Sequence, residues 1–319
     1  MLASAISVFA GDNHWTGSAN NGLWSDSLNW SLGHTPDSSE DVYIDGSSEA
    51  TVTLNIDAQV GLLQLGGGLG NQTLLVTNST LYISRGIIAT NAVLNLSEAH
   101  CSIFGFLSST NYGKILSSKG ATNSFSVYSG EFRNSGVFQA ETNADLFLYV
   151  YNGSFNDGTR FDGSGTIKLL HDSNVGCHGN MFVNGRFSFD GIISGTNTWH
   201  GPGIFDWTEG KFSYGGMTLA SNLQVNAVGP LLQLGDQAYL TNDSVFHWLG
   251  GVFSSFYSVI NIFENRGVMV LDKEASLFWT VFRNTGTILS PPGGTNYFSV
   301  YNGDFKNSGT FQADTTAIF

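Results

Sequence analysis

The chain has 319 residues, of which 41% are hydrophobic and only 12% are charged, with 40 glycines and 5 prolines. The hydrophobic content excludes intrinsic disorder, and the scarcity of helix-favouring residues and of amphipathic helical patterns predicts an all-β fold. The net charge of −13 argues against binding to nucleic acid or to an anionic membrane, because both require clustered cations. No apolar run reaches the roughly 18 residues of a membrane span.

The two ends of the chain are abrupt. Residues 1–10 form a short apolar stretch that ends in small and aliphatic residues, as before a signal-peptidase site, although no basic residue precedes it. We interpret it as the remnant of a secretion signal, with an ordinary first strand as the alternative. The final motif copy ends just before Phe319 without a capping segment, so we expect a fragment of a longer solenoid.

Residues 11–46 are distinguished by clustered tryptophans: Trp15, Trp24 and Trp30. We expect this segment to cap the open end of the first coil, where aromatic rings would cover apolar area. The alternative is that the three rings form a surface on which sugars stack. Residues 47–319 show no linker and are predicted to form one continuous array.

One long stretch of the sequence occurs twice. Thr122 to Glu141 reads TNSFSVYSGEFRNSGVFQAE, and Thr295 to Asp314 reads TNYFSVYNGDFKNSGTFQAD. Weaker versions of its F-x-N-x-G centre recur between and around the two copies, at steps of roughly 20 residues. A repeat of this length is one supersecondary unit that cannot bury its own apolar face, so neighbouring units must stack.

The repeat predicts short strands separated by bends. Its residues alternate apolar and polar, as in a strand with one buried face, and Asn and Gly accept the positive φ of a bend. Coils of about 20 to 23 residues would then form a parallel β-helix in which Asn side chains hydrogen-bond along the stack. The repeat positions are Phe132, Asn134, Gly136, Phe138, Phe263, Asn265, Gly267, Phe282, Asn284, Gly286, Phe305, Asn307, Gly309 and Phe311. On the same spacing, Phe155 should be equivalent to Phe132, and Asp157 should take the Asn position.

The Trp-rich opening and the later coils, such as Gly201 to Val225 (GPGIFDWTEGKFSYGGMTLASNLQV), resemble bacterial secreted β-solenoid proteins. These are the autotransporter passengers and the filamentous-haemagglutinin-like adhesins. The resemblance covers nearly the whole chain and implies a right-handed β-helix, export and a role at the cell surface.

Candidate chemical groups are few. His171, Cys177 and His178 are metal-ligand types, but no second pair stands at zinc spacing. Cys101 and Cys177 should lie three to four coils apart, too far for a disulfide. We therefore expect two buried free thiols and no cofactor, although an acidic surface would suit calcium.

Four aspartates are candidates for an enzymatic site, because glycoside hydrolysis needs two carboxylates flanking one bond. They are Asp157, Asp162, Asp172 and Asp190, with Lys168 and Arg186 as the nearby basic residues. Stacked coils also bring carboxylates together without any catalytic purpose, and Asp-Gly pairs form turns. Surface turns are therefore the favoured interpretation.

These features predict a secreted or cell-surface structural or adhesive β-solenoid without catalysis. Its partner would be an extracellular or cell-surface carbohydrate or protein. The alternative is a polysaccharide lyase or glycoside hydrolase that acts in a groove of the β-helix. Regular coils and scarce charge favour the first hypothesis.

Overall fold

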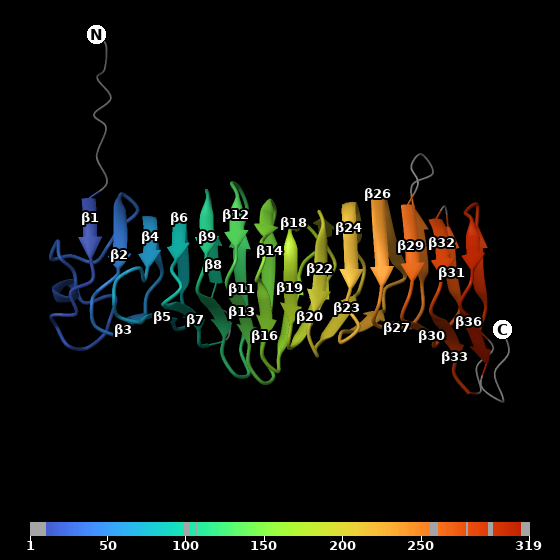
Figure 1. Cartoon of the computed structure of the whole chain (residues 1–319). Helices are drawn as coiled ribbons and strands as arrows, with labels where there is room; N and C mark the ends of the chain where they lie inside the picture. Colours follow the sequence, from blue (N-terminus) through green and yellow to red (C-terminus); the bar gives the residue numbers. More distant parts are fainter. Residues whose placement is uncertain are drawn as a thin grey trace, which may run out of the picture.

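The computed structural model describes residues 11–98, 102–105, 107–255, 261–278, 280–292 and 296–313. The chain winds into an elongated parallel β-solenoid of about 12 turns, with coils of roughly 22 residues (Figure 1). The prediction of an all-β parallel solenoid is confirmed. The expected signal remnant, residues 1–10, lies outside the described residues, as does Cys101.

Each coil has three sides, which stack into three parallel sheets that the chain visits in the order I, II, III. Sheet I contains the N-terminal parts of β4 (Ala58–Leu65) and β6 (Thr80–Ile88), then β8 (Ser102–Gly105), β11 (Thr122–Val127), β14 (Asp145–Val150), β17 (Thr166–Leu169), β20 (Arg186–Phe189), β23 (Ile204–Trp207), β25 (Gln224–Ala227), β27 (Val245–Trp248), β30 (Val268–Leu271), β33 (Thr287–Ser290) and β36 (Thr310–Ala313).

Sheet II contains β1 (Gly11–His14), β2 (Glu40–Ile44), the C-terminal parts of β4 and β6, β9 (Ser109–Asn111), β12 (Phe132–Asn134), β15 (Gly153–Phe155), β18 (Asn174–Cys177), β21 (Ile192–Ser194), the N-terminal parts of β24 (Lys211–Leu219) and β26 (Leu231–Asn242), β28 (Val252–Ser255), β31 (Ala275–Phe278) and β34 (Phe298–Tyr301). Sheet III contains β3 (Ala50–Leu54), β5 (Gln72–Val76), β7 (Ala92–Leu96), β10 (Lys114–Ser117), β13 (Val137–Ala140), β16 (Arg160–Asp162), β19 (Gly179–Val183), β22 (Asn197–His200), the C-terminal parts of β24 and β26, β29 (Asn261–Asn265), β32 (Thr280–Asn284) and β35 (Phe305–Asn307).

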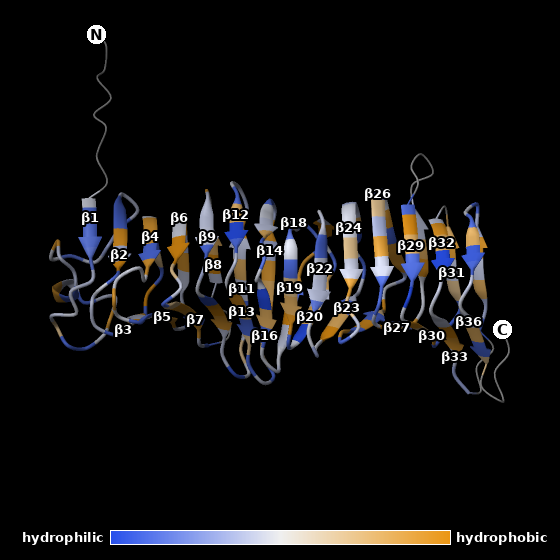
Figure 2. Ribbon diagram, viewed as in Figure 1, coloured by the Kyte–Doolittle hydropathy of each residue, from blue (hydrophilic) through white to orange (hydrophobic). Residues whose placement is uncertain are grey.

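Alternate side chains of each strand point into the coil and form one continuous core. Figure 2 shows the corresponding mixture of hydrophobic and hydrophilic residues along the strands. Aromatic rings fill the middle of the solenoid, where Phe161 stacks on Phe138 with centroids 5.9 Å apart and contacts Phe187 at 4.2 Å. Burial of such rings is the dominant favourable term in folding, and it requires neighbouring coils.

The strand register corrects one predicted alignment. Phe263, Phe282 and Phe305 are directly opposite one another, as expected from the repeat. Phe132, however, lies opposite Gly153, and Phe155 lies opposite Asn134. The equivalence of Phe132 and Phe155 was therefore wrong, because the coil that begins at Phe132 is shorter than the one that precedes it and returns to the same place two positions early. All of these rings except Phe305 are buried.

The two copies of the repeated stretch occupy different sides of the solenoid. The first copy supplies β11, β12 and β13, in sheets I, II and III, whereas the second supplies β34, β35 and β36, in sheets II, III and I. The offset between the copies is therefore not a whole number of coils. Because every side is a short strand followed by a corner, the same sequence can begin on any side.

Asparagine side chains hydrogen-bond from coil to coil, as predicted. Asn111 Nδ2 donates to Asn134 Oδ1 at 2.6 Å, at the corner between sheets II and III. A second ladder follows the corner between sheets III and I, with steps of 2.8, 2.7 and 2.7 Å; it comprises Asn242, Asn265, Asn284 and Asn307. Asn242 was not predicted as a member, because it lacks the following glycine.

Asp157 does not occupy the ladder. Asn134 Nδ2 instead donates to Thr159 Oγ1 at 3.0 Å, two positions further along the chain. Asp157 is exposed and accepts hydrogen bonds from the backbone N–H and the side-chain amide of Asn180, at 2.7 and 2.9 Å. This displacement follows from a longer corner: four residues separate Phe155 from Arg160, whereas two separate Asn134 from Val137, the residues opposite them in the preceding coil.

The glycines of the repeat are required by close packing and not by positive φ, which corrects the predicted reason for them. Gly136, Gly267, Gly286 and Gly309 are absent from the positions with positive φ. A Cβ atom on Gly286 would lie 2.1 Å from the carbonyl oxygen of Gly267, and one on Gly309 would lie 2.1 Å from that of Gly286. Stacked glycines therefore let adjacent corners approach.

The Trp-rich segment folds over the first coil. The backbone N–H groups of Trp15 and Trp24 donate to the carbonyls of Tyr43 and Thr53, and a short 3-10 helix, η1 (Ser27–Asn29), follows Trp24. Trp30 contacts both other rings edge-on, at 5.1 and 4.7 Å, and donates through Nε1 to Trp24 O. Trp24 and Trp30 are 0% and 3% exposed, so they cannot form a sugar-stacking surface.

Candidate functional site

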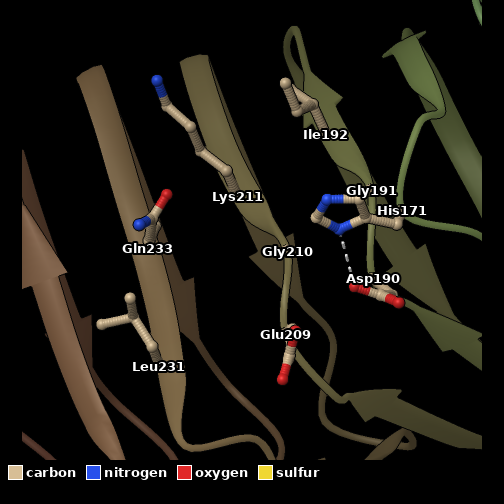
Figure 3. Close-up of a pocket in the computed structure, with 9 residues that line it drawn as sticks. All are labelled: His171, Asp190, Gly191, Ile192, Glu209, Gly210, Lys211, Leu231 and Gln233. Atoms are coloured by element: carbon tan, nitrogen blue, oxygen red, sulfur yellow. Dashed lines mark ion pairs between the residues drawn. The ribbon is translucent and has the colours of Figure 1, made fainter.

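A groove follows the corner between sheets I and II in the middle of the solenoid (Figure 3). Two hollows of about 490 and 450 Å³ lie end to end, and His171 and Ile192 border both. The first is lined by His171, Asp190, Gly191, Ile192, Glu209, Gly210, Lys211, Leu231 and Gln233. The second adds Tyr151, Asn152, Asp172, Ser173 and Asn174.

The hollow exists because the corner backbone carries small residues. Gly191 and Gly210 stand at equivalent points of neighbouring coils, and a Cβ atom on Gly210 would lie 2.6 Å from Gly191 O. Gly210 also has a φ of +69°, a conformation that side chains disfavour. Backbone hydrogen bonds from Ile192 N to Ser173 O and from Lys211 N to Gly191 O, at 2.8 and 2.9 Å, fix the stacking here.

Acidic groups recur at this corner in successive coils. Asp172, Asp190 and Glu209 each follow a strand of sheet I, namely β17, β20 and β23. Asp190 lies beside His171, with 3.6 Å between Oδ1 and Nδ1, and its shielded Oδ1 makes no hydrogen bond. One carboxylate oxygen of the groove, Asp190 Oδ1, therefore has unused capacity to accept a hydrogen bond.

The basic side chains near the groove already pair with carboxylates. Lys211 pairs with Asp236 at 3.2 Å, Lys168 pairs with Asp145 at 3.3 Å, and Arg186 donates to Asp206. Lys168 also lies over the Phe147 ring, 5.2 Å from its centroid. Neither Lys168 nor Arg186, the two basic candidates expected from the sequence, lines the groove.

The structure separates the four candidate aspartates. Asp172 and Asp190 border the groove, whereas Asp157 lies between β15 and β16, at another corner. Asp162 accepts from Arg160 Nε at 3.3 Å and from Asn184 Nδ2 at 2.7 Å, which is ordinary surface pairing. Glu209 was missed by the sequence interpretation, because no local motif marks it; only the coil stacking places it beside Asp190.

The dipeptide Cys177-His178 does not form a ligand pair. Cys177 points into the core with 0% exposure, and burial raises the pKa of its thiol, while His178 is exposed. Among the described residues, no group of three or more His, Cys, Asp or Glu side chains could hold a metal ion. No described helix is long and apolar enough to cross a bilayer.

The fold and the groove define the class of molecule, a parallel β-solenoid with an acidic hollow on its flank. Comparison with protein-family models, with curated proteins and with solved structures finds no match.

Proposed function

We propose that the chain is a secreted or cell-surface structural rod whose flank adheres to a ligand, and that it has no catalytic activity. The observation that carries this proposal is the continuity of strand pairing. Each sheet runs from coil to coil through the described residues, with an irregular register between Ser213 and Gly215 in β24. A solenoid of this kind is stiff along its axis, which suits projection from a surface.

The hydrogen-bonded ladders add to the stiffness. Asn265 is 0% exposed and joins its side-chain amide to those of Asn242 and Asn284. Breaking one such step would leave a buried polar group without its partner, which costs about 1 to 3 kcal/mol. Bending or local opening of the rod is therefore unfavourable.

Rod shape and adhesion can be measured separately. Small-angle scattering should give a rod of about 60 Å, from about 12 turns at about 4.8 Å each. Beads coated with the chain should be retained on surfaces that carry extracellular polysaccharide or matrix protein. Beads coated with an unrelated protein of similar net charge should not be retained. A compact scattering profile, or equal retention of both kinds of bead, would contradict the proposal.

A second candidate function is a polysaccharide lyase or glycoside hydrolase, and the groove carries the observation in its favour. Asp190 and Glu209 both line it, and two carboxylates beside one glycosidic bond are the requirement for hydrolysis. Incubation with neutral and uronate polysaccharides, followed by assays for reducing ends and unsaturated products, decides between the two functions. Products that disappear in Glu209→Gln would establish the enzyme.

A further inference from the structure

Outward-facing aromatic residues lead directly into the groove. Tyr82, Phe104 and Tyr128 stack on successive coils, with centroids 5.1 and 5.9 Å apart and both pairs inclined by 14°. Tyr151 follows on the next coil, where its N–H donates to Val127 O, the residue before Tyr128. Tyr128 and Tyr151 are 50% and 65% exposed. We call Tyr82, Phe104, Tyr128 and Tyr151 the aromatic strip.

The aromatic strip and the groove form one surface, because Tyr151 also lines the hollow that contains His171 and Asp172. The surface thus passes from aromatic rings, three of them with hydroxyl tips, to the carboxylates of Asp172, Asp190 and Glu209. We propose that it binds a neutral polysaccharide chain lying parallel to the solenoid axis, with one sugar ring per coil. This proposal rests on the adhesive function above and gives it a ligand class.

Charge argues for a neutral chain over an anionic one. Asp172, Asp190 and Glu209 are acidic, and the lysine of the groove, Lys211, is paired with Asp236. Uronate or sulfated polymers would therefore be repelled. Hydroxyl groups of a neutral sugar donate to carboxylates in charge-assisted hydrogen bonds, which are stronger than neutral ones.

Spacing argues for a sugar chain over a basic peptide. Groups of this surface repeat once per coil, about 4.8 Å, the distance between neighbouring strands. A 1,4-linked pyranose ring advances along its own chain by nearly the same distance. An extended peptide presents side chains to one face every second position, about 6.6 to 6.8 Å, and so falls out of register within a few coils.

The test is calorimetric titration of the folded chain with defined probes. Neutral probes are 1,4-linked oligomers of glucose, xylose, mannose and N-acetylglucosamine, from dimer to hexamer. The hexamer of galacturonate and hexa-arginine represent the anionic and the basic-peptide alternatives. We expect at least one neutral series to bind with affinity that rises with length, and with galacturonate binding at least tenfold more weakly.

Matched variants locate the site. Tyr151→Ala and Asp190→Asn should each weaken binding of the best neutral hexamer at least tenfold. Tyr112→Ala removes a 52% exposed tyrosine at the corner between sheets II and III, and Asp157→Asn removes an exposed acid at the same corner; neither should change affinity more than twofold.

The proposal is overturned if no neutral hexamer binds, if hexa-arginine or the galacturonate hexamer binds as tightly as the best neutral oligomer, or if the control variants weaken binding as much as the site variants. A null result in the titration with a rod-like scattering profile would remove the ligand class and leave the structural role intact. Circular dichroism of each variant shows that the fold is retained.

Discussion

Asn265 Nδ2 donates to Asn284 Oδ1 at 2.7 Å, and Asn284 Nδ2 donates in turn to Asn307 Oδ1 at the same distance. Each of these side-chain amides thus takes part in hydrogen bonds along the axis through both its oxygen and its nitrogen. An ionised carboxylate could only accept, and a hydroxyl has a single hydrogen to donate. At the same corner, the carbonyl of Asn265 accepts the backbone N–H groups of Thr285 and Gly286, at 2.9 and 3.0 Å. Asn265 therefore provides hydrogen-bond partners at this corner through both its side chain and its backbone carbonyl.

The first prediction concerns the ladder at the other asparagine corner. Asn134→Leu should destabilise the chain by about 1 to 3 kcal/mol, because it leaves the buried side-chain amide of Asn111 without its acceptor. The Thr159 hydroxyl loses one bond but still donates to the backbone carbonyl of residue 134. Asn184→Leu is the control, since Asn184 is exposed and its side-chain amide donates only to the surface carboxylate of Asp162, outside either ladder. Thermal melting of both variants measures the difference. Equal melting temperatures for Asn134→Leu and the unmodified chain would show that the amide is ordinary corner chemistry.

Much of this arrangement is predictable from sequence, because stacking imposes a similar spacing on every coil. The F-x-N-x-G motif predicted the strands, the ladder and the opposed rings of Phe263 and Phe282, all of which the structure contains. Alternation with a period of two is a local property, so it is visible without the fold. The number of residues in each corner cannot be read from this alternation. For that reason Phe155 and Asp157 were assigned to the wrong positions.

The groove was largely invisible to sequence analysis for a related reason. Asp190 was a candidate, but its neighbour Glu209 lies one coil further along the chain in an unremarkable Glu-Gly pair. Only the register between Ile192 and Lys211 brings the two corners together. A hollow made by omitting side chains at Gly191 and Gly210 leaves no pattern that differs from an ordinary turn.

The second prediction concerns the aromatic core. Phe132→Ala should cost about 3 to 5 kcal/mol, because Phe132 is 1% exposed and its removal leaves a cavity beside Phe125 and Phe138. Phe305→Ala should cost clearly less, since the ring of Phe305 is 44% exposed. Urea denaturation followed by tryptophan fluorescence compares the two. A larger loss for Phe305→Ala would contradict the assigned core.

The third prediction concerns stacked glycines. Gly286→Ala should destabilise by about 1 to 3 kcal/mol, because the new methyl group would lie 2.1 Å from Gly267 O, which is backbone and cannot turn aside. Gly216→Ala is a matched control within β24: its Cβ would meet nothing within 4 Å, and its φ is not positive. Thermal melts of the two alanine variants should differ. Equal stability would show that adjacent corners separate easily.

The last prediction is a pH dependence at Asp157. Hydrogen bonds from the backbone N–H and the side chain of Asn180 hold the pKa of Asp157 below its usual range. A carboxyl whose pKa is lower in the folded state stabilises the fold above its unfolded pKa, about 3.9, and loses that contribution as the pH falls through the folded value. Asp157→Asn should therefore melt slightly below the unmodified chain at pH 7.

The difference between the two melting temperatures should shrink as the pH falls below about 4 and vanish once Asp157 is protonated in both states. Thermal melts of both proteins between pH 3 and pH 7 provide the measurement. Asn180→Ala is the matched variant, because it removes the side-chain donor and keeps the backbone N–H, so it should abolish only part of the pH dependence. A melting difference that stays constant across this range would mean that Asp157 holds Asn180 no better when charged than when neutral.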